Sequence, residues 1–268
     1  MWQTPFPRLV ATDLDGTVVR SDGTISGRTV RALAAVEDAG ATLVFVTGRP
    51  PRWMHSVAEA TGHRGLAVCA NGALVYDLHD ERIVTSFLLE PPVLRRLTRA
   101  LRRGLPEVAF AVDYGLEMLY EPAYRSAEAG RPGVRTAGGD ELLAYPAAKL
   151  LAQHGALDAD TLLARAQEVA GGYATFTHSS RDGLLELSAA GVSKASTLAR
   201  LCGERGIAPE EVLAFGDMPN DLPLLAWAGR AYAVANAHPE VVDAVPLRTR
   251  SNDEDGVAEV LEQVFLDV

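Results

Sequence analysis

The chain has 268 residues and a formal net charge of −10, with 48% hydrophobic and 22% charged residues. This length allows one large domain or two modest ones, and the composition is that of an ordinary soluble globular protein. The acidic balance argues against a general nucleic-acid-binding protein, because no surplus of cations exists to displace counterions from phosphates. It does not exclude a small phosphorylated ligand, since a bound metal ion and a few well-placed cations can invert the local field.

The N-terminal segment lacks the apolar stretch after a basic start that marks a secretory leader, and no apolar run approaches the ~20 residues of a membrane span. We therefore expect a cytoplasmic protein without membrane contact. The only two cysteines, Cys69 and Cys202, do not have zinc-binding spacing. Cys69 lies in an apolar run, which predicts a buried free thiol. No obligatory protein partner is evident.

The N-terminal part of the chain alternates between apolar runs and a helical pattern. Residues 8–13 form an apolar run that ends in a carboxylate, and residues 43–47 and 66–70 are runs of the same kind. Such continuous runs are typical of strands buried on both faces of a parallel sheet. Between the first two runs, residues 27–39 have apolar residues at helical spacing and stop at Gly40.

The middle of the chain has a different pattern. Strand-like runs with a period of two lie at residues 108–114, 116–120, 173–178 and 184–188, and helical stretches lie near residues 91–103 and 158–170. This mixture predicts an α+β cap inserted into the main domain. We expect the core in residues 1–83 and 188–268, the cap in residues 84–187, and hinges at residues 80–82 and 189–191.

In the C-terminal part, a helical pattern is again followed by apolar runs. Residues 194–205 have helical spacing after Ser193, and apolar runs follow at residues 212–216 and 231–235. Strands alternating with helices at both ends of the chain predict a doubly wound, Rossmann-like α/β core with a parallel sheet.

Polar residues follow four of the predicted strands, at or just past the point where each strand ends. They are Asp13, Thr47, Asn71 and Asp217. In an open α/β sheet, ligands bind outside the carboxyl ends of the strands. The sequence therefore predicts that these side chains converge on one crevice.

Asp13 and Asp15 belong to the segment Asp13–Thr17. Side chains two residues apart in an extended segment lie on the same face of that segment. Gly16 permits a sharp turn directly after the two aspartates. Paired carboxylates can divide the roles of nucleophile or metal ligand and of general acid and base. The alternative is a surface turn that merely favours Asp and Gly. A calcium loop is excluded by its missing ligands.

Three further groups can hold phosphate or metal. The Thr47 hydroxyl and the backbone N–H groups around Gly48 can bind phosphate oxygens, although Thr47 could also simply cap a helix. Lys194 begins a helix, where a cation is unfavourable unless an anion lies beside it, and a solvated lysine is the alternative. Asp217, Asn220 and Asp221 offer the oxygen ligands that suit Mg²⁺, although Asp221 could be a helix cap.

In this order, the segments DLDGT, VTGR, GVSK and GDMPND resemble the four motifs of the haloacid dehalogenase superfamily. Their spacing resembles the Cof-type phosphatases, which carry a type IIB α/β cap between the second and third motifs. The segments ANGA and SNDEDGVAEVLE are also similar to that subgroup. The resemblance covers essentially the whole chain and implies a Mg²⁺-dependent phosphatase of small metabolites.

The resemblance also implies a role for each matching residue. Asp13 would attack phosphorus and form an aspartyl-phosphate, and Asp15 would move protons while its backbone carbonyl contacts Mg²⁺. Asp217 would bind the metal and Asp221 would orient its ligands. The groups that would contact or neutralise phosphate are Thr47, Gly48, Lys194 and Asn220, with Asn71 in support.

Several alternatives remain open at this level. A phosphomutase or other phosphotransferase would use the same residues, and a non-catalytic binding protein could share the fold. Sugar phosphates, nucleotides and phosphorylated cofactors all fit as substrates. The five arginines within residues 92–103 could recruit an anion, although a solvated surface is the simpler interpretation. His178 and Arg181, in a predicted hairpin loop, could contact the substrate.

Overall fold

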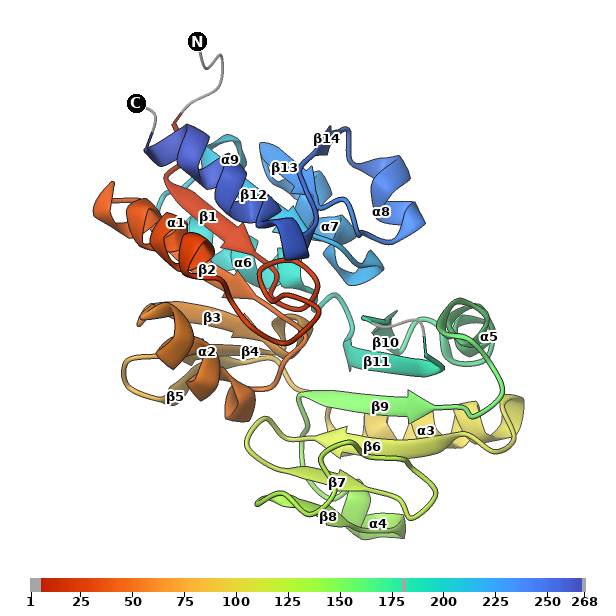
Figure 1. The fold of residues 1–268 in the computed structure, drawn as a ribbon. Coiled ribbons are helices and arrows are strands. Elements are labelled where there is room, and N and C mark those ends of the chain that lie inside the picture. Colours follow the sequence, from red (N-terminus) through yellow and green to blue (C-terminus); the bar gives the residue numbers. More distant parts are fainter. Residues whose placement is uncertain (1–5, 180–181, 267–268) are drawn as a thin grey trace.

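The computed structural model describes residues 6–179 and 182–266, which form two sheets with helices packed on them (Figure 1). The core sheet has the order β14-β13-β12-β1-β2-β3-β4-β5. Its strands are β1 (Leu9–Thr12), β2 (Thr42–Val46), β3 (Leu66–Cys69), β4 (Leu74–Asp77), β5 (Arg82–Ser86), β12 (Val212–Gly216), β13 (Arg230–Ala233) and β14 (Leu247–Arg248).

The strands from β14 to β3 are parallel, and β4 and β5 add an antiparallel edge. Helices cover both faces of this sheet, with α1 against α9 on one face and α6 against α7 on the other (Figure 1). The core helices are α1 (Gly27–Asp38), α2 (Met54–Thr61), α6 (Lys194–Glu204), α7 (Leu222–Trp227), α8 (Pro239–Ala244) and α9 (Gly256–Phe265). The doubly wound α/β core predicted from the sequence is confirmed.

The cap is a separate sheet with the order β10-β11-β9-β6-β7-β8, mostly antiparallel. Its strands are β6 (Ala109–Asp113), β7 (Met118–Tyr120), β8 (Val134–Thr136), β9 (Lys149–Gln153), β10 (Ala174–Thr177) and β11 (Leu184–Ala189), and its helices are α3 (Pro91–Gly104), α4 (Gly139–Leu142) and α5 (Ala159–Ala170). Leucines of α3 and α5 pack on one face of the sheet. The other face is turned toward the core.

The chain passes between the two sheets twice, through residues 87–90 after β5 and residues 190–193 after β11. The predicted boundaries after residues 83 and 187 fall inside β5 and β11. The first predicted hinge, at residues 80–82, lies at the turn between β4 and β5, within the core sheet. The second, at residues 189–191, adjoins the crossing segment after β11.

Cys69 is a buried free thiol, as predicted, and Cys202 is also a buried free thiol. Within residues 6–179 and 182–266, no helix combines the length and the apolar character that crossing a bilayer requires. The cytoplasmic location expected from the sequence stays a prediction.

Candidate active site

The site lies where the order of the core strands reverses. The chain runs outward from β1 through β2 to β3 and later returns to place β12 on the other side of β1. Asp13 follows β1 directly and Asp217 follows β12, so these neighbouring parallel strands deliver two carboxylates to one edge. This is the switch point at which open α/β sheets bind ligands.

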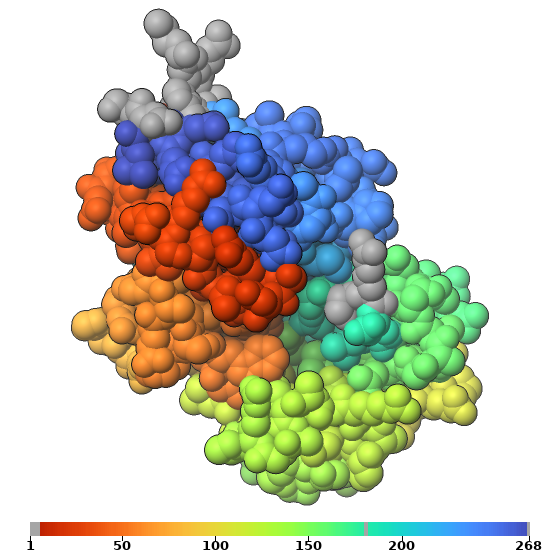
Figure 2. Space-filling view, viewed as in Figure 1, coloured from red at the N-terminus to blue at the C-terminus, as the bar shows by residue number. Residues whose placement is uncertain are grey.

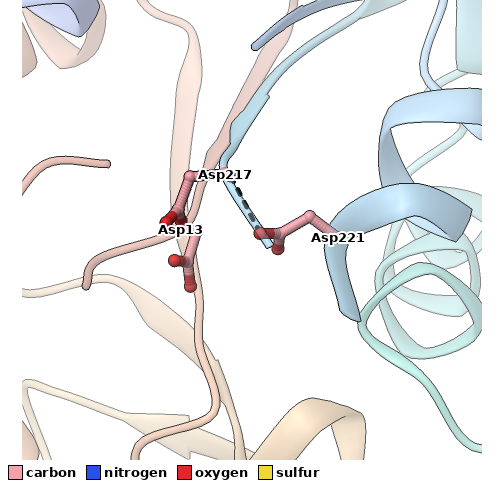
Figure 3. A group of neighbouring side chains, drawn as sticks. All are labelled: Asp13, Asp217 and Asp221. Carbon is pink, nitrogen blue, oxygen red and sulfur yellow. Dashed lines mark hydrogen bonds between the residues drawn. The ribbon is translucent and has the colours of Figure 1, made fainter. Parts of the chain in front are cut away.

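Three buried carboxylates meet at this edge, from Asp13, Asp217 and Asp221 (Figure 3). Each offers an oxygen, and these atoms all lie within 4.8 Å of one another. One cation holds two of them, because Lys194 Nζ donates to Asp13 Oδ1 and to Asp221 Oδ1, at 2.7 Å each. Lys194 is itself 1% exposed, so it is not the solvated lysine considered above.

Asp221 has a further structural task. Its Oδ2 accepts the backbone N–H groups of Asp217 and Met218, both at 3.1 Å, which fixes the turn after β12. Since its Oδ1 is bound by Lys194, both of its oxygens already have partners. Asp221 therefore orients the other groups of the cluster, while the carboxylates of Asp13 and Asp217 are the better placed to bind a metal ion.

The electrostatics of the cluster fit a divalent cation. Burial is the main cause that raises the pKa of Asp13, with Lys194 opposing it and the neighbouring acids adding to it. Burial and the charge of Asp221 raise the pKa of Asp217 to about 7. Crowded carboxylates of this kind oppose one another's ionisation, and a hard cation that accepts oxygen ligands would offset that repulsion.

Gly16 and Thr17 explain the local shape of the first motif. Gly16 has a φ of +77°, and a Cβ at this position would lie 2.4 Å from Asp217 Oδ2. Glycine is thus required both for the turn and for the close approach of the two loops. The Thr17 hydroxyl donates to Asp217 Oδ1 at 2.9 Å and holds that carboxylate in place.

Thr47 and Asn71 form the next part of the edge. Both are buried, and Asn71 N donates to Thr47 O at 3.0 Å. Asn71 adopts a left-handed conformation (φ 55°), and its Oδ1 accepts from Asn220 Nδ2 at 3.0 Å. The structure thus joins the ends of β2 and β3 to the loop after β12. The Thr47 hydroxyl accepts the N–H of Arg49 in a local turn. It does not cap the helical turn that follows at Pro51–Trp53, which has no side-chain cap, so the helix-cap alternative is not borne out.

Asp15 occupies a different environment from Asp13. Its carboxylate is 58% exposed and is bound by Arg49, with Nε–Oδ2 at 2.8 Å and Nη2–Oδ1 at 2.5 Å. Both aspartates line the same cavity, as predicted from their spacing. Asp15 is, however, not part of the buried cluster of Asp13, Asp217 and Asp221. Its partner Arg49 is a site residue that the sequence analysis did not identify.

The cap contributes a buried ion pair that the sequence analysis did not identify. Lys149 Nζ donates to Glu186 Oε2 at 2.5 Å and to Gly48 O of the core at 2.8 Å. Asn71 Nδ2 donates to the same carboxylate at 2.9 Å. One feature of the sequence could have indicated Lys149, because Lys149 and Lys194 are the only lysines of the chain. Both are buried at this site.

Core and cap enclose a cavity of about 370 Å³ above these groups. Figure 2 shows the surface hollowed where the red and orange core meets the green cap. On one side the domains are joined by Arg52, which donates to Asp113 at 2.9 Å and to Glu128 at 2.7 Å. Trp53 Nε1 also donates to Glu128, at 2.6 Å. The cavity has the size of a small-metabolite site.

The predicted hairpin between β10 and β11 is confirmed, but His178 does not line the cavity. It is 1% exposed and pairs with Asp160 at 2.9 Å. Ser179 and Asp182 of the same loop do line the cavity, and Ser179 donates to Glu186. Arg181 lies outside the described residues.

A family model described as "haloacid dehalogenase-like hydrolase" matches residues 10–261, which includes all four motifs. The chain belongs to the haloacid dehalogenase-like hydrolase family. The Cof-type resemblance noted in the sequence is thereby confirmed, and the chain is an enzyme of the hydrolase class rather than a binding protein that merely shares the fold.

Relatives of this hydrolase include proteins named as phosphatases. The putative phosphatase YxeH of Bacillus subtilis is 27% identical, with 97% of this chain and 98% of that protein covered. A phosphoglycolate phosphatase of Methanopyrus kandleri is 28% identical over the same shares. The HMP-PP phosphatase of Yersinia pestis is 27% identical over 89% of this chain and 88% of that protein.

Solved structures agree with the fold. A protein of Streptococcus mutans UA159 superposes with a TM-score of 0.85 at 20% identity, covering 98% of this chain and all of that one. A haloacid dehalogenase-like hydrolase from Bacteroides thetaiotaomicron has a TM-score of 0.78 at 28% identity, covering 97% and 100%. The whole chain, including the cap, therefore has the architecture of this hydrolase family.

Proposed function

We propose that this hydrolase is a Mg²⁺-dependent phosphatase that removes phosphate from small phosphorylated metabolites through an aspartyl-phosphate on Asp13. The observation that carries the proposal is the contact of Lys194 with Asp13 and Asp221 beside Asp217. It combines a candidate nucleophile, a buried cation and a candidate metal-binding carboxylate in one cluster, from which Asp13 reaches the wall of the cavity. The phosphatase names of the relatives support the same reaction class.

In the first step, a carboxylate oxygen of Asp13 forms a bond to phosphorus and the bond from phosphorus to the ester oxygen breaks. Asp15, as a carboxylic acid, gives its proton to the departing oxygen. Lys194 neutralises negative charge on Asp13 and on the transferring group, and the Thr47 hydroxyl and the Gly48 and Asn220 groups orient the phosphate oxygens. Charge neutralisation and positioning are the main requirements of phosphoryl transfer.

In the second step, water attacks the phosphorus of the aspartyl-phosphate and orthophosphate leaves, which regenerates Asp13. Asp15, now a carboxylate, accepts the proton of the attacking water. Mg²⁺ held by Asp13, Asp217 and the Asp15 carbonyl would supply a positive charge against the phosphate oxygens. Asp221 would keep Lys194 and the loop after β12 in place throughout.

Residues of the cap close the active site. Lys149 and Glu186 contact the loops that carry Gly48 and Asn71, so the cap closes directly over the expected phosphate position. A closed site excludes bulk water during the first step and admits a small leaving group. Sugar phosphates, nucleotides and phosphorylated cofactors are all compatible with a cavity of about 370 Å³.

The test is phosphate release from a panel of phosphorylated metabolites, with the wild type, Asp13→Asn and the exposed control Asp38→Asn. We expect Asp13→Asn to lose turnover by about 10⁴-fold or more while Asp38→Asn resembles the wild type. Borohydride trapping during turnover should convert Asp13 to homoserine in the wild type only. Turnover retained by Asp13→Asn would contradict the nucleophile assignment. Transfer of phosphate to a second hydroxyl without release of orthophosphate would favour the phosphotransferase alternative.

A further inference from the structure

The cap carries a second hollow, between α3 and the end of α5, and four of the nine residues that line it are arginines. Its volume is about 760 Å³. The residues that matter for its chemistry are Arg95, Arg96, Arg99, Arg103, Val169 and Tyr173. All six are exposed to solvent. We call this hollow the arginine groove.

The arginine groove lies on the far side of the cap from the active site. Successive residues of a strand point to opposite faces of a sheet. In β9, Lys149 and Leu151 line the active-site cavity, while Leu150 packs with Leu97 of α3 in the core of the cap. Figure 1 shows α3 behind the cap sheet. The sheet thus separates the groove from Asp13, so the groove is not an extension of the active site.

The positive charge of α3 contrasts with the negative net charge of the whole chain. The helix has five arginines and no acidic residue in its 14 residues. The chain as a whole has a net charge of −10, so without these five arginines it would have −15 (−10 − 5). Arg99 has an arginine three and four residues away on both sides. Like charges at this spacing destabilise a helix, and a bound anion would reverse that effect.

Part of the groove is already organised. The Arg96 guanidinium lies over the Tyr173 ring, 3.8 Å from its centroid, and donates to the Tyr173 hydroxyl. Arg102 is engaged elsewhere, with Glu121 and over the Phe110 ring. Among the described residues, by contrast, the guanidinium groups of Arg99 and Arg103 have neither a hydrogen bond nor an ion pair. These two groups can bind an anion without giving up an existing contact.

We propose that the arginine groove binds a small anion that carries two or more phosphate groups. A single exposed ion pair contributes little, so the ligand must engage several guanidinium groups together. Arg95, Arg99 and Arg103 follow one another at steps of about 6 Å along the helix, which suits a chain of linked phosphates. The planar guanidinium binds two phosphate oxygens at once, a geometry that lysine does not offer. The volume of the groove falls in the range of small-ligand sites.

The test measures binding of tripolyphosphate by calorimetry, with chelator present so that Mg²⁺ does not contribute. We expect the wild type to bind, and Arg99→Gln/Arg103→Gln to bind at least tenfold more weakly. Arg99→Lys, which keeps the charge but not the planar fork, should weaken binding severalfold. Arg31→Gln, an exposed arginine of α1, is the matched control and should bind like the wild type. Asp13→Asn should also bind like the wild type, because the groove is independent of the active site.

Three results would overturn the proposal. One is equal affinity in the wild type and in Arg99→Gln/Arg103→Gln. Another is a changed affinity in Asp13→Asn, stronger or weaker, which would place the anion at the active site. The third is binding of polyglutamate without binding of tripolyphosphate, which would indicate an acidic protein partner. Thermal unfolding checks that the double variant is folded, and we expect its melting temperature without ligand to be at least that of the wild type. The test does not require phosphatase activity and is therefore independent of the proposed function.

Discussion

Arg49 binds the carboxylate of Asp15 at two points, through Nε at 2.8 Å and Nη2 at 2.5 Å. Such a two-point contact fixes both the position and the plane of the carboxylate. Both aspartates line the cavity, but the Asp15 side chain is 58% exposed, whereas the Asp13 side chain is 7% exposed. Arg49 is therefore the group that would keep the proposed proton carrier at a constant distance from the proposed nucleophile.

We predict that Arg49→Ala lowers kcat/KM by about 10- to 100-fold, because a proton carrier without its partner spends less time in the reactive position. Steady-state kinetics measures the loss. The control is Arg64→Ala, an exposed arginine in a core loop. A variant with an unchanged kcat/KM would show that the contact with Asp15 has no catalytic consequence.

Gly16→Ala is predicted to reduce activity by more than 100-fold. The added methyl group would lie 2.4 Å from Asp217 Oδ2 in a backbone conformation that alanine disfavours, so either the turn or the Asp217 carboxylate must move. Activity and the affinity for Mg²⁺ should fall together. Gly23→Ala, in an open turn with a similar φ of +82°, tests backbone strain alone. Equal losses in both variants would mean that the close approach to Asp217 is unimportant.

Mg²⁺ is predicted to stabilise the folded protein. A ligand that binds only the folded state at 100 times its dissociation constant adds about 2.7 kcal/mol to the free energy of unfolding. Asp217→Asn should reduce this gain strongly, because it removes a carboxylate from the buried cluster, whereas the exposed control Asp243→Asn should not. Thermal unfolding with Mg²⁺ and with chelator measures the difference. An equal gain in both variants would place the metal elsewhere.

Lys149 and Glu186 are predicted to be strongly coupled. Their side chains are 6% and 5% exposed, so Lys149→Met leaves a buried carboxylate without its cation, at a cost of about 3–5 kcal/mol. The double variant Lys149→Met/Glu186→Gln should lose much less stability than the sum of the losses in the two single variants. Urea unfolding of the two single variants and the double variant measures the coupling energy. Strict additivity would contradict the pairing.

The lowered pKa of Glu128 predicts that the folded protein loses stability as the solution becomes acidic. Burial opposes its ionisation, but the hydrogen bonds and charge of Arg52 and the bond from Trp53 outweigh it, and the pKa of Glu128 lies below its ordinary value of 4.5. The folded protein therefore binds this proton less readily than the unfolded chain does. The stabilisation is present above about pH 4.5 and is lost as the pH falls through the lowered pKa.

Glu128→Gln should consequently be less stable than the wild type at neutral pH, with a shallower loss of stability between about pH 5 and pH 3. Unfolding by urea at several pH values measures both quantities. Glu141→Gln, a cap residue in an exposed ion pair with Arg135, is the control and should show neither effect. A wild-type acid slope in Glu128→Gln would show that another group is responsible.

Five core strands, β1, β2, β3, β12 and β13, were predictable because each carries a continuous apolar run, and the polar residues at their ends indicated the site. The edge strands β5 and β14 were not predicted, because their residues are mostly exposed and form no such run. Asp13 and Asp217 are far apart in sequence, yet both follow an apolar run, and parallel pairing of β1 with β12 brings them together. The same reasoning identified α1 and α6 from their spacing and their stop at glycine or start after serine. For the core, the local pattern and the tertiary contacts agree.

The cap was harder to predict because its central strand gives no strand signal. The β9 sequence, Lys149–Gln153, contains Lys, Leu, Ala and Gln, which favour helix over strand. Its conformation is set by pairing with β6 and β11, which the sequence alone does not show. Lys149 and its contact with Glu186 were missed for the same reason. The Arg52–Glu128 contact between core and cap was also missed, since it depends on how the two sheets face each other.

The burial of both lysines offers a way to observe the two domains separately. Lys149 begins β9 of the cap and Lys194 begins α6 of the core, and the chain has no other lysine. Protein labelled with ¹⁵N-lysine would therefore give two backbone amide resonances, one from each domain. Their exchange broadening and response to added phosphate esters would report opening of the cap and filling of the phosphate position independently. A molecule of 268 residues would thus yield a two-line spectrum that separates domain motion from chemistry.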